Sequence, residues 1–152
     1  MALPSIFEQN TNEVFFKRLE KLKNDSKPLW GKMDAPKMLA HLNVAYDLAF
    51  DRKKSKPNFF MKILIRLFVK RIVTNEKPYG NNSPTAPVFI ISSNMNFEKE
   101  KSELIANIKD VQSKGQTYFE GKVNQNFGKL TAIEWNNMFY KHLDHHFRQF
   151  GI

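Results

Sequence analysis

The chain has 152 residues, no cysteine and a formal net charge of +9. Its length and its hydrophobic content of 41% favour one globular domain, residues 1–152, with a core large enough to fold without cross-links. The lack of cysteine excludes disulfides, thiolate metal ligands and a cysteine nucleophile.

The N-terminal segment has no features of a targeting sequence. Residues 1–21 lack the basic stretch followed by an apolar run that marks a signal peptide. No later segment reaches the roughly 18 uninterrupted apolar residues that a membrane-spanning helix needs. These patterns predict a cytoplasmic protein.

Two helices are predicted in the first third of the chain. The first spans about residues 11–24, where Asn10 and Glu13 have the spacing of a capping box. The second spans about residues 34–51, with Asp34 as N-cap and Pro36 in its first turn. Apolar residues recur along both at helical spacing, and His41 lies on the apolar stripe of the second.

A long crossover, about residues 52–96, follows the second helix and carries most of the excess charge. Residues 51–71 contain eight lysines and arginines and a single acidic residue. Since nucleic-acid-binding proteins usually spread basic side chains over a whole face, this local charge predicts no nucleic-acid partner. Residues 59–73 form a basic amphipathic helix, with Lys62, Arg66 and Lys70 four apart.

This basic helix has two interpretations. We expect its apolar face to cap the helical core while its lysines stay in water, because exposing so much apolar surface would favour aggregation. In that position it could form a wall of a substrate pocket. The alternative is contact with an anionic membrane surface. We expect no membrane contact on balance.

Two further helices are predicted after the crossover. The third begins at Asn96 or Phe97 and ends before Gly115. The fourth spans about residues 131–151, and Thr131 and Glu134 form another capping box. Trp30 and Trp135 are expected in the core. Four amphipathic helices joined by one long crossover predict an all-α four-helix bundle with an additional amphipathic helix.

Three of the four histidines occur within five residues near the C-terminus. His142 and His146 are four apart, so both side chains lie on one face of the last helix. That face also carries the apolar residues of the helix, and His41 lies on the inward stripe of another. Three imidazoles on facing helices suit a divalent metal ion, Zn or Ni above all. They leave a coordination position open, as catalytic sites do.

Two neighbouring residues are predicted to have catalytic roles. His145 is one step from His146, so it points aside and could act beside the metal or as a proton carrier. Gln149 lies one turn beyond His145 and could orient a ligand or the substrate. The alternative is that the histidines only interact with the dipole at the end of a helix. The inward position of His41 and His142 favours metal binding.

The sequence resembles the DinB/YfiT-like superfamily, in a branch of poorly characterised bacterial proteins. The resemblance covers most of the chain and rests on PLWGKMDAPKMLAHLNVAYD, residues 28–47, and on GKLTAIEWNNMFYKHLDHHFRQFG, residues 128–151. It implies an up-down-down-up bundle with a long link between the second and third helices. It also implies a divalent metal held by His41, His142 and His146. Some members of the superfamily are transferases that use small thiols.

Together these features predict a metal-dependent enzyme with a small-molecule substrate. Its three-histidine site would activate a water or a low-molecular-weight thiol, giving a hydrolase or a thiol S-transferase. The alternative is a module that binds a metal or small ligand without turnover. Both a monomer and a homodimer are compatible with the sequence.

Overall fold

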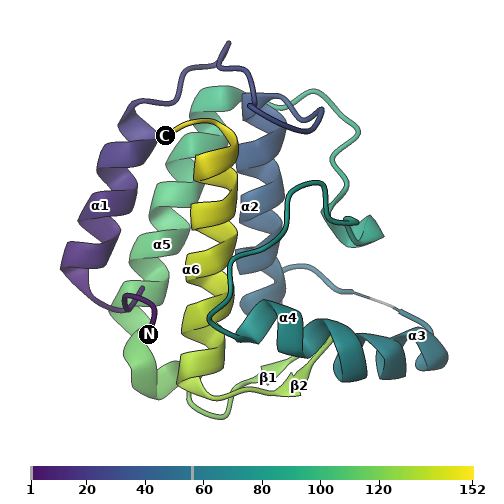
Figure 1. Cartoon of the computed structure of the whole chain (residues 1–152). Coiled ribbons are helices and arrows are strands. Elements are labelled where there is room, and N and C mark those ends of the chain that lie inside the picture. Colours follow the sequence, from purple (N-terminus) through teal and green to yellow (C-terminus); the bar gives the residue numbers. More distant parts are fainter. Residues whose placement is uncertain (1, 56) are drawn as a thin grey trace.

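The chain is mostly helical. The computed structural model describes residues 2–55 and 57–152, and it consists almost entirely of helices and their connections (Figure 1). The long helices are α1 (Gln9–Glu20), α2 (Ala35–Ala49), α5 (Phe97–Phe119) and α6 (Ala132–Gln149). The crossover holds α3 (Phe59–Leu64), a wide π-helical turn η1 (Ile65–Val69), α4 (Lys70–Thr74) and the 3-10 turn η2 (Pro87–Phe89). This composition agrees with the predicted all-α class.

Side-chain caps begin three of the four long helices. Asp34 accepts a hydrogen bond from the Lys37 backbone at the start of α2, as predicted. Asn96 caps α5 in the same way. The predicted capping box of α6 is present in both directions between Thr131 and Glu134. These caps define where the helices begin and therefore which residues face inward.

The capping box predicted for the first helix is wrong. α1 begins at Gln9, earlier than expected, and its N-cap Glu8 makes no side-chain cap. Asn10 instead accepts from the adjacent Thr11 backbone, and Glu13 accepts from the Gln9 side chain. The helix starts earlier because Ile6 is fully buried and hydrogen-bonded to Asn136, which places the preceding chain against α6.

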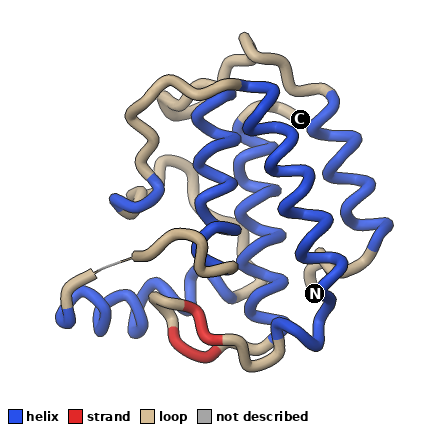
Figure 2. The backbone as a smooth tube through the Cα atoms, turned by 180° about the vertical axis from the view of Figure 1, so that it is seen from behind, coloured by secondary structure: helices blue, strands red, loops and turns tan. Residues whose placement is uncertain are grey.

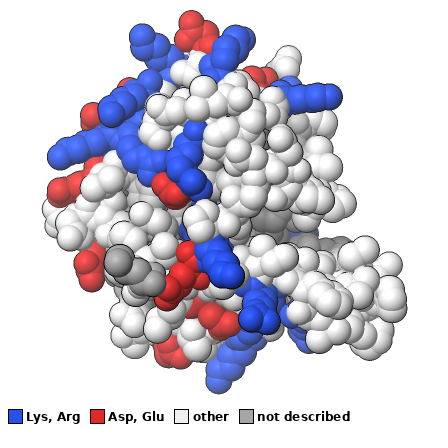
Figure 3. Space-filling view, in the orientation of Figure 1, with Lys and Arg blue, Asp and Glu red and all other residues white. Residues whose placement is uncertain are grey.

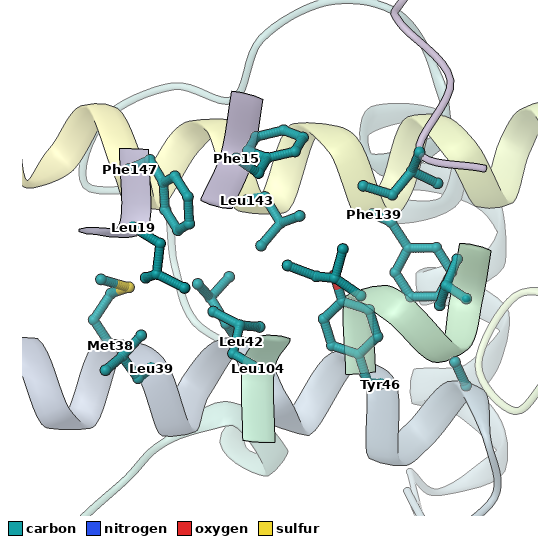
Figure 4. Packing of buried hydrophobic residues seen from close by; sticks show 14 of the residues in the cluster. Phe15, Leu19, Met38, Leu39, Leu42, Tyr46, Leu104, Phe139, Leu143 and Phe147 are labelled. Carbon is teal, nitrogen blue, oxygen red and sulfur yellow. The ribbon is translucent and has the colours of Figure 1, made fainter. Parts of the chain in front are cut away.

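The four long helices lie side by side around one apolar core. Figures 1 and 2 show them aligned, with α1 and α6 running in one direction and α2 and α5 in the other. Buried side chains from all four point toward one another, as Figure 4 shows for Phe15, Leu42, Leu104 and Phe139. Tyr46 and Phe139 stack with 5.0 Å between their ring centroids. Trp135 is fully buried in this core, as predicted.

The last part of α5 and its connection to α6 contain two features that periodicity did not indicate. Gly115 has a φ of 71°, which interrupts α5 where the helix was predicted to end, and helical turns resume as far as Phe119. A short antiparallel hairpin follows, formed by β1 (Val123–Asn124) and β2 (Gly128–Lys129).

The crossover is fastened to α6 where α4 ends. The buried Lys141 ammonium donates to the carbonyl oxygens of Ile72 and Asn75 at 2.6 and 2.9 Å and to the Asn75 side chain at 2.9 Å. Asn137 donates to the Thr74 carbonyl at 2.9 Å. From this point the chain passes across α2 and α6 toward η2 (Figure 1).

The expectation that the basic helix caps the core is wrong. The segment α3–η1–α4 extends away from the long helices, and most of its large apolar side chains are exposed. The contacts of Lys141 and Asn137 hold only its C-terminal end, so its N-terminal turns lie beyond the core. Within the described part of the chain, no helix combines the length and the apolar composition needed to cross a membrane.

Candidate metal centre

Two helices bring three of the histidines together. The Thr131 cap starts α6 in a register that places His142 and His146 on successive turns, facing α2. His41 comes from α2, opposite both of them. One ring nitrogen from each of the three lies within 4.8 Å of the others. His41 and His146 are buried and His142 is half-buried, so the predicted group assembles at the interface of two helices.

The imidazole rings are packed closely around one point. Their centroids are 4.9 Å apart for His41 and His142, 4.6 Å for His41 and His146, and 5.0 Å for His142 and His146. The Nε2 atoms of His41 and His142 are 2.9 Å apart. Ligand nitrogens about 2.0–2.1 Å from a shared ion would be separated by roughly 3 Å. The observed spacing is compatible with ligands to one cation and also with a hydrogen bond between the two rings.

The second ring nitrogen of His41 is held by the crossover. His41 Nδ1 lies 3.0 Å from the carbonyl oxygen of Phe89 in η2. Because a carbonyl can only accept, Nδ1 carries the proton and Nε2 presents its lone pair. The interaction leaves His41 Nε2 directed at His142 Nε2, 2.9 Å away.

Gln149 holds the second ring nitrogen of His146. The Gln149 Oε1 atom accepts from His146 Nδ1 at 2.7 Å, and Gln149 Nε2 donates to the Trp30 carbonyl at 2.8 Å. Since the Trp30 carbonyl requires a donor, the amide orientation is settled and His146 Nε2 is free for a metal. Gln149 therefore holds the His146 ring in one orientation, a position compatible with the predicted role of orienting a ligand.

Burial keeps the three imidazoles uncharged. It lowers the pKa of His41, lowers the pKa of His142 well below its ordinary value, and lowers the pKa of His146 to about 3. Repulsion from His145 lowers the pKa of His41 further, and repulsion mainly from His41 lowers those of His142 and His146, while the Phe89 and Gln149 acceptors partly oppose the effect on His41 and His146. At neutral pH the three lone pairs are thus available, and the group could hold a metal ion.

Comparison with known proteins places the chain in a family. The profile of a family described as protein of unknown function (DUF1569) matches residues 7–151. The chain belongs to the DUF1569 family. The match includes all four long helices, the crossover and every residue of the three-histidine group. No curated protein and no solved structure matches the chain.

His145 of this DUF1569 protein lies beside the three-histidine group but is not part of it. Its ring contacts those of Trp30, Tyr79 and His146 at centroid distances of 5.9, 5.8 and 5.0 Å. Its buried Nδ1 atom has no hydrogen-bond partner among the described residues. Burial lowers the pKa of His145, so it is an uncharged base at neutral pH. The geometry is compatible with the predicted proton carrier.

Three residues around the centre were missed or misplaced by the sequence analysis. Phe89 holds His41 through its carbonyl and packs its ring against His41 and His142. Trp30, expected in the core, lies partly exposed against His145 instead. Tyr79 also contacts the His145 ring, with 5.8 Å between the ring centroids. All three occur in irregular segments rich in proline and glycine, where no periodicity indicates which way a side chain points.

Proposed function

We propose that this DUF1569 protein is a divalent-metal-dependent enzyme of the DinB/YfiT-like superfamily. On this proposal residues 1–152 form a single domain, and the four long helices form the up-down-down-up bundle of that superfamily. The match of residues 7–151 to one family and the opposed directions of the helices support it. The reaction class is hydrolysis or the transfer of a small thiol onto an electrophile.

One observation carries the proposal. Three uncharged imidazoles from two helices bring one ring nitrogen each within 4.8 Å of the others, and the Phe89 carbonyl and Gln149 orient two of these rings. Without a cation, His142 Nε2 can donate a hydrogen bond to His41 Nε2 at 2.9 Å, and a metal ion would replace this bond with a ligand bond to each ring. Nitrogen ligands of this kind suit Zn or Ni. The residues present therefore fit a divalent metal.

The protein would orient the metal ligands, supply a base and exclude water from part of the site. A bound ion would supply a Lewis acid that lowers the pKa of a water or a thiol. Three protein ligands leave room for that substrate atom. His145 would accept the released proton at one of its ring nitrogens. The Phe89 ring would exclude water on the side of His41 and His142.

The thiol itself would come from outside the protein. The chain has no cysteine, so an S-transfer reaction requires a low-molecular-weight thiol as co-substrate. The substrate is then a small electrophile, and the protein acts in the cytoplasm, where such thiols stay reduced.

A second candidate is a binding module without turnover. The burial of the histidines favours a binding module, because His41 and His146 are buried and only His142 is half-buried. Such a module would hold a metal or a small ligand in the same three-histidine group. The two candidates share the metal centre and differ in whether a substrate reacts there.

Metal content tests both candidates. We expect untagged protein to contain about one divalent ion per chain by mass spectrometry, and the His41→Ala and His146→Ala variants to lose it. The matched control is His145→Ala, which removes a neighbouring imidazole and should keep the ion. A wild-type protein that holds no metal after reconstitution with Zn or Ni would overturn both candidates.

Turnover then separates the enzyme from the binding module. Metal-loaded wild type should consume thiol and electrophile pairs or a hydrolysable ester. His145→Ala should keep the metal and lose about 10²-fold or more of the rate if His145 is the base. Metal-loaded protein that turns over neither class of substrate would leave the binding module as the function.

A further inference from the structure

The helical segment of residues 59–72, here called the projecting helix, exposes an unusual amount of apolar surface. Of the 14 large hydrophobic side chains that are exposed among the described residues, eight belong to it. Phe59 is 81% exposed, Phe60 69%, Leu67 65% and Phe68 64%. In Figure 3 the lobe that it forms is white over its visible surface. Contiguous exposed apolar patches on monomers usually mark interaction sites.

The projection is part of the fold rather than a frayed end. Lys141 holds the last turn through three hydrogen bonds, and Asn137 holds the Thr74 carbonyl. Lys70 pairs with Glu134 of α6 at 3.3 Å and donates to the Lys129 carbonyl at 3.4 Å. The base of the projecting helix is therefore attached to α6 and the hairpin, while its N-terminal turns extend away from the core (Figure 1).

The segment around the projecting helix is strongly basic. Residues 52–75 contain eight lysines and arginines and no acidic residue, so the first carboxylate after Asp51 is Glu76. Blue side chains lie at the base of the white lobe in Figure 3, with red ones among them. Arg52, Lys54 and Lys70 pair with Asp47, Asp51 and Glu134, so the basic side chains of the helix that remain for an anionic surface are Lys62, Arg66 and Arg71. An apolar surface with a basic margin complements a layer of apolar chains beneath negative headgroups.

We propose that the projecting helix docks on the surface of an anionic phospholipid bilayer. Its exposed phenylalanines and leucine enter the boundary between headgroups and acyl chains, and Lys62, Arg66 and Arg71 pair with lipid phosphates. The proposal is independent of the metal centre, because the projecting helix contributes none of the three histidines.

Charge favours this occupant over a second copy of the chain. A two-fold contact through the same face would bring the same set of cations together from both copies. Protein interfaces are also depleted in lysine, whereas anionic headgroups attract each lysine or arginine near the surface. The exposed apolar residues alone would fit either a bilayer or a second copy of the chain. The basic residues beside them favour the bilayer.

Vesicle co-sedimentation tests the proposal on the untagged full chain. We expect binding to phosphatidylcholine vesicles with about 30% phosphatidylglycerol, and little binding to phosphatidylcholine alone. Raising NaCl to about 0.5 M should weaken binding, because the screening length becomes shorter than the span of the basic segment. The double variant Phe59→Ser/Phe60→Ser should bind at least about tenfold more weakly.

Matched controls separate a local effect from a general one. Val14→Ser/Ile133→Ser removes two exposed apolar side chains elsewhere, 57% and 65% exposed, and should bind as wild type does. Lys62→Gln/Arg71→Gln should lower binding to anionic vesicles. Helical circular dichroism and metal content, equal in all variants, show that folding is intact.

Three outcomes would overturn the proposal. The first is no binding of wild type to anionic vesicles at low salt. The second is equal binding by Phe59→Ser/Phe60→Ser, which would mean adsorption by charge alone. The third is a dimer in light scattering that the same variant dissociates, without vesicle binding; the projecting helix would then be a contact between copies.

Discussion

At the scale of single residues, the centre depends on groups that hold the histidines as much as on the histidines themselves. His41 donates a hydrogen bond from Nδ1 to the Phe89 carbonyl, and His146 donates one from Nδ1 to the Gln149 side chain. These bonds fix which nitrogen carries the lone pair. The backbone acceptor is insensitive to mutation, whereas Gln149 can be tested directly.

Replacing Gln149 should weaken metal binding without abolishing it. Gln149→Leu removes the acceptor that holds His146 Nδ1, so we expect the dissociation constant for Zn to rise by about 10- to 100-fold. Competition with a chromophoric chelator measures this change. Gln9→Leu, a substitution of an exposed glutamine at the start of α1, is the control and should have no effect. Unchanged affinity in Gln149→Leu would mean that His146 does not need this partner.

Acid should destabilise the metal-free protein through the buried histidines. The pKa of His146 is about 3 in the folded protein and about 6.5 when unfolded, so the unfolded chain binds the extra proton between these values. Stability is therefore complete above pH 6.5 and falls as the pH decreases below it. Between pH 6.5 and 5, His146 alone should cost about 2 kcal/mol.

The variant His146→Asn isolates this contribution. Urea unfolding in the presence of a chelator measures the free energy of unfolding at each pH. Below pH 6 this free energy should depend on pH less steeply in the variant than in wild type, and the difference in slope should correspond to about one bound proton per molecule. His41, His142 and His145 are present in both proteins, so the difference between the two curves is assigned to His146. Parallel curves for the two proteins would show that folding does not lower the pKa of His146.

At the scale of secondary-structure elements, the sequence predicted the long helices well and their surroundings poorly. Asp34, Asn96 and Thr131 are followed by apolar residues at helical spacing, and all three caps are present. The same spacing placed His41, His142 and His146 on inward stripes, so helical periodicity was enough to group the three. In a helix, the spacing of the apolar residues indicates which face is buried.

The crossover could not be predicted in the same way. Residues 75–96 follow no period, so the contacts of Tyr79 and Phe89 with the histidines depend on tertiary packing alone. The amphipathic pattern of residues 59–73 correctly predicted a helix but not its direction. That direction follows from Lys141 and Asn137, two polar residues on a helix otherwise assigned to the core.

Two substitutions can compare the capping box of α6, which the structure shows, with the one that the sequence predicted for the first helix. Thr131→Ala removes an observed cap and should lower the free energy of unfolding by about 1 kcal/mol. Asn10→Ala alters a residue whose spacing to Glu13 suggested a cap that the structure lacks, and should change stability by less than about 0.5 kcal/mol. Urea denaturation of both variants measures the difference. Equal losses of stability would mean that Asn10 caps the first helix as its spacing to Glu13 predicted.

At the scale of the whole molecule, one buried lysine connects the crossover to the helix that carries the metal centre. Lys141 is adjacent to His142, and its ammonium binds the backbone of Ile72 and Asn75 while lying 4.5 Å from the centre of the Tyr79 ring. The segment that follows Asn75 supplies Tyr79 and Phe89 to the centre. The position of these rings therefore depends on where Lys141 fixes the chain.

Lys141→Met should release the crossover while leaving the four long helices folded. Burial lowers the pKa of Lys141 to about 8, yet the ammonium is mostly charged at pH 7, and bonds from charged donors are worth about 1.5–3 kcal/mol. We expect a loss of that order in the free energy of unfolding and faster hydrogen exchange across residues 59–95 than across α2 and α5. Lys37→Met, at a half-buried lysine near the start of α2, is the control and should change neither. If Lys141→Met exchanges as wild type does over residues 59–95, then the crossover is held by its other contacts, and the centre does not depend on this lysine.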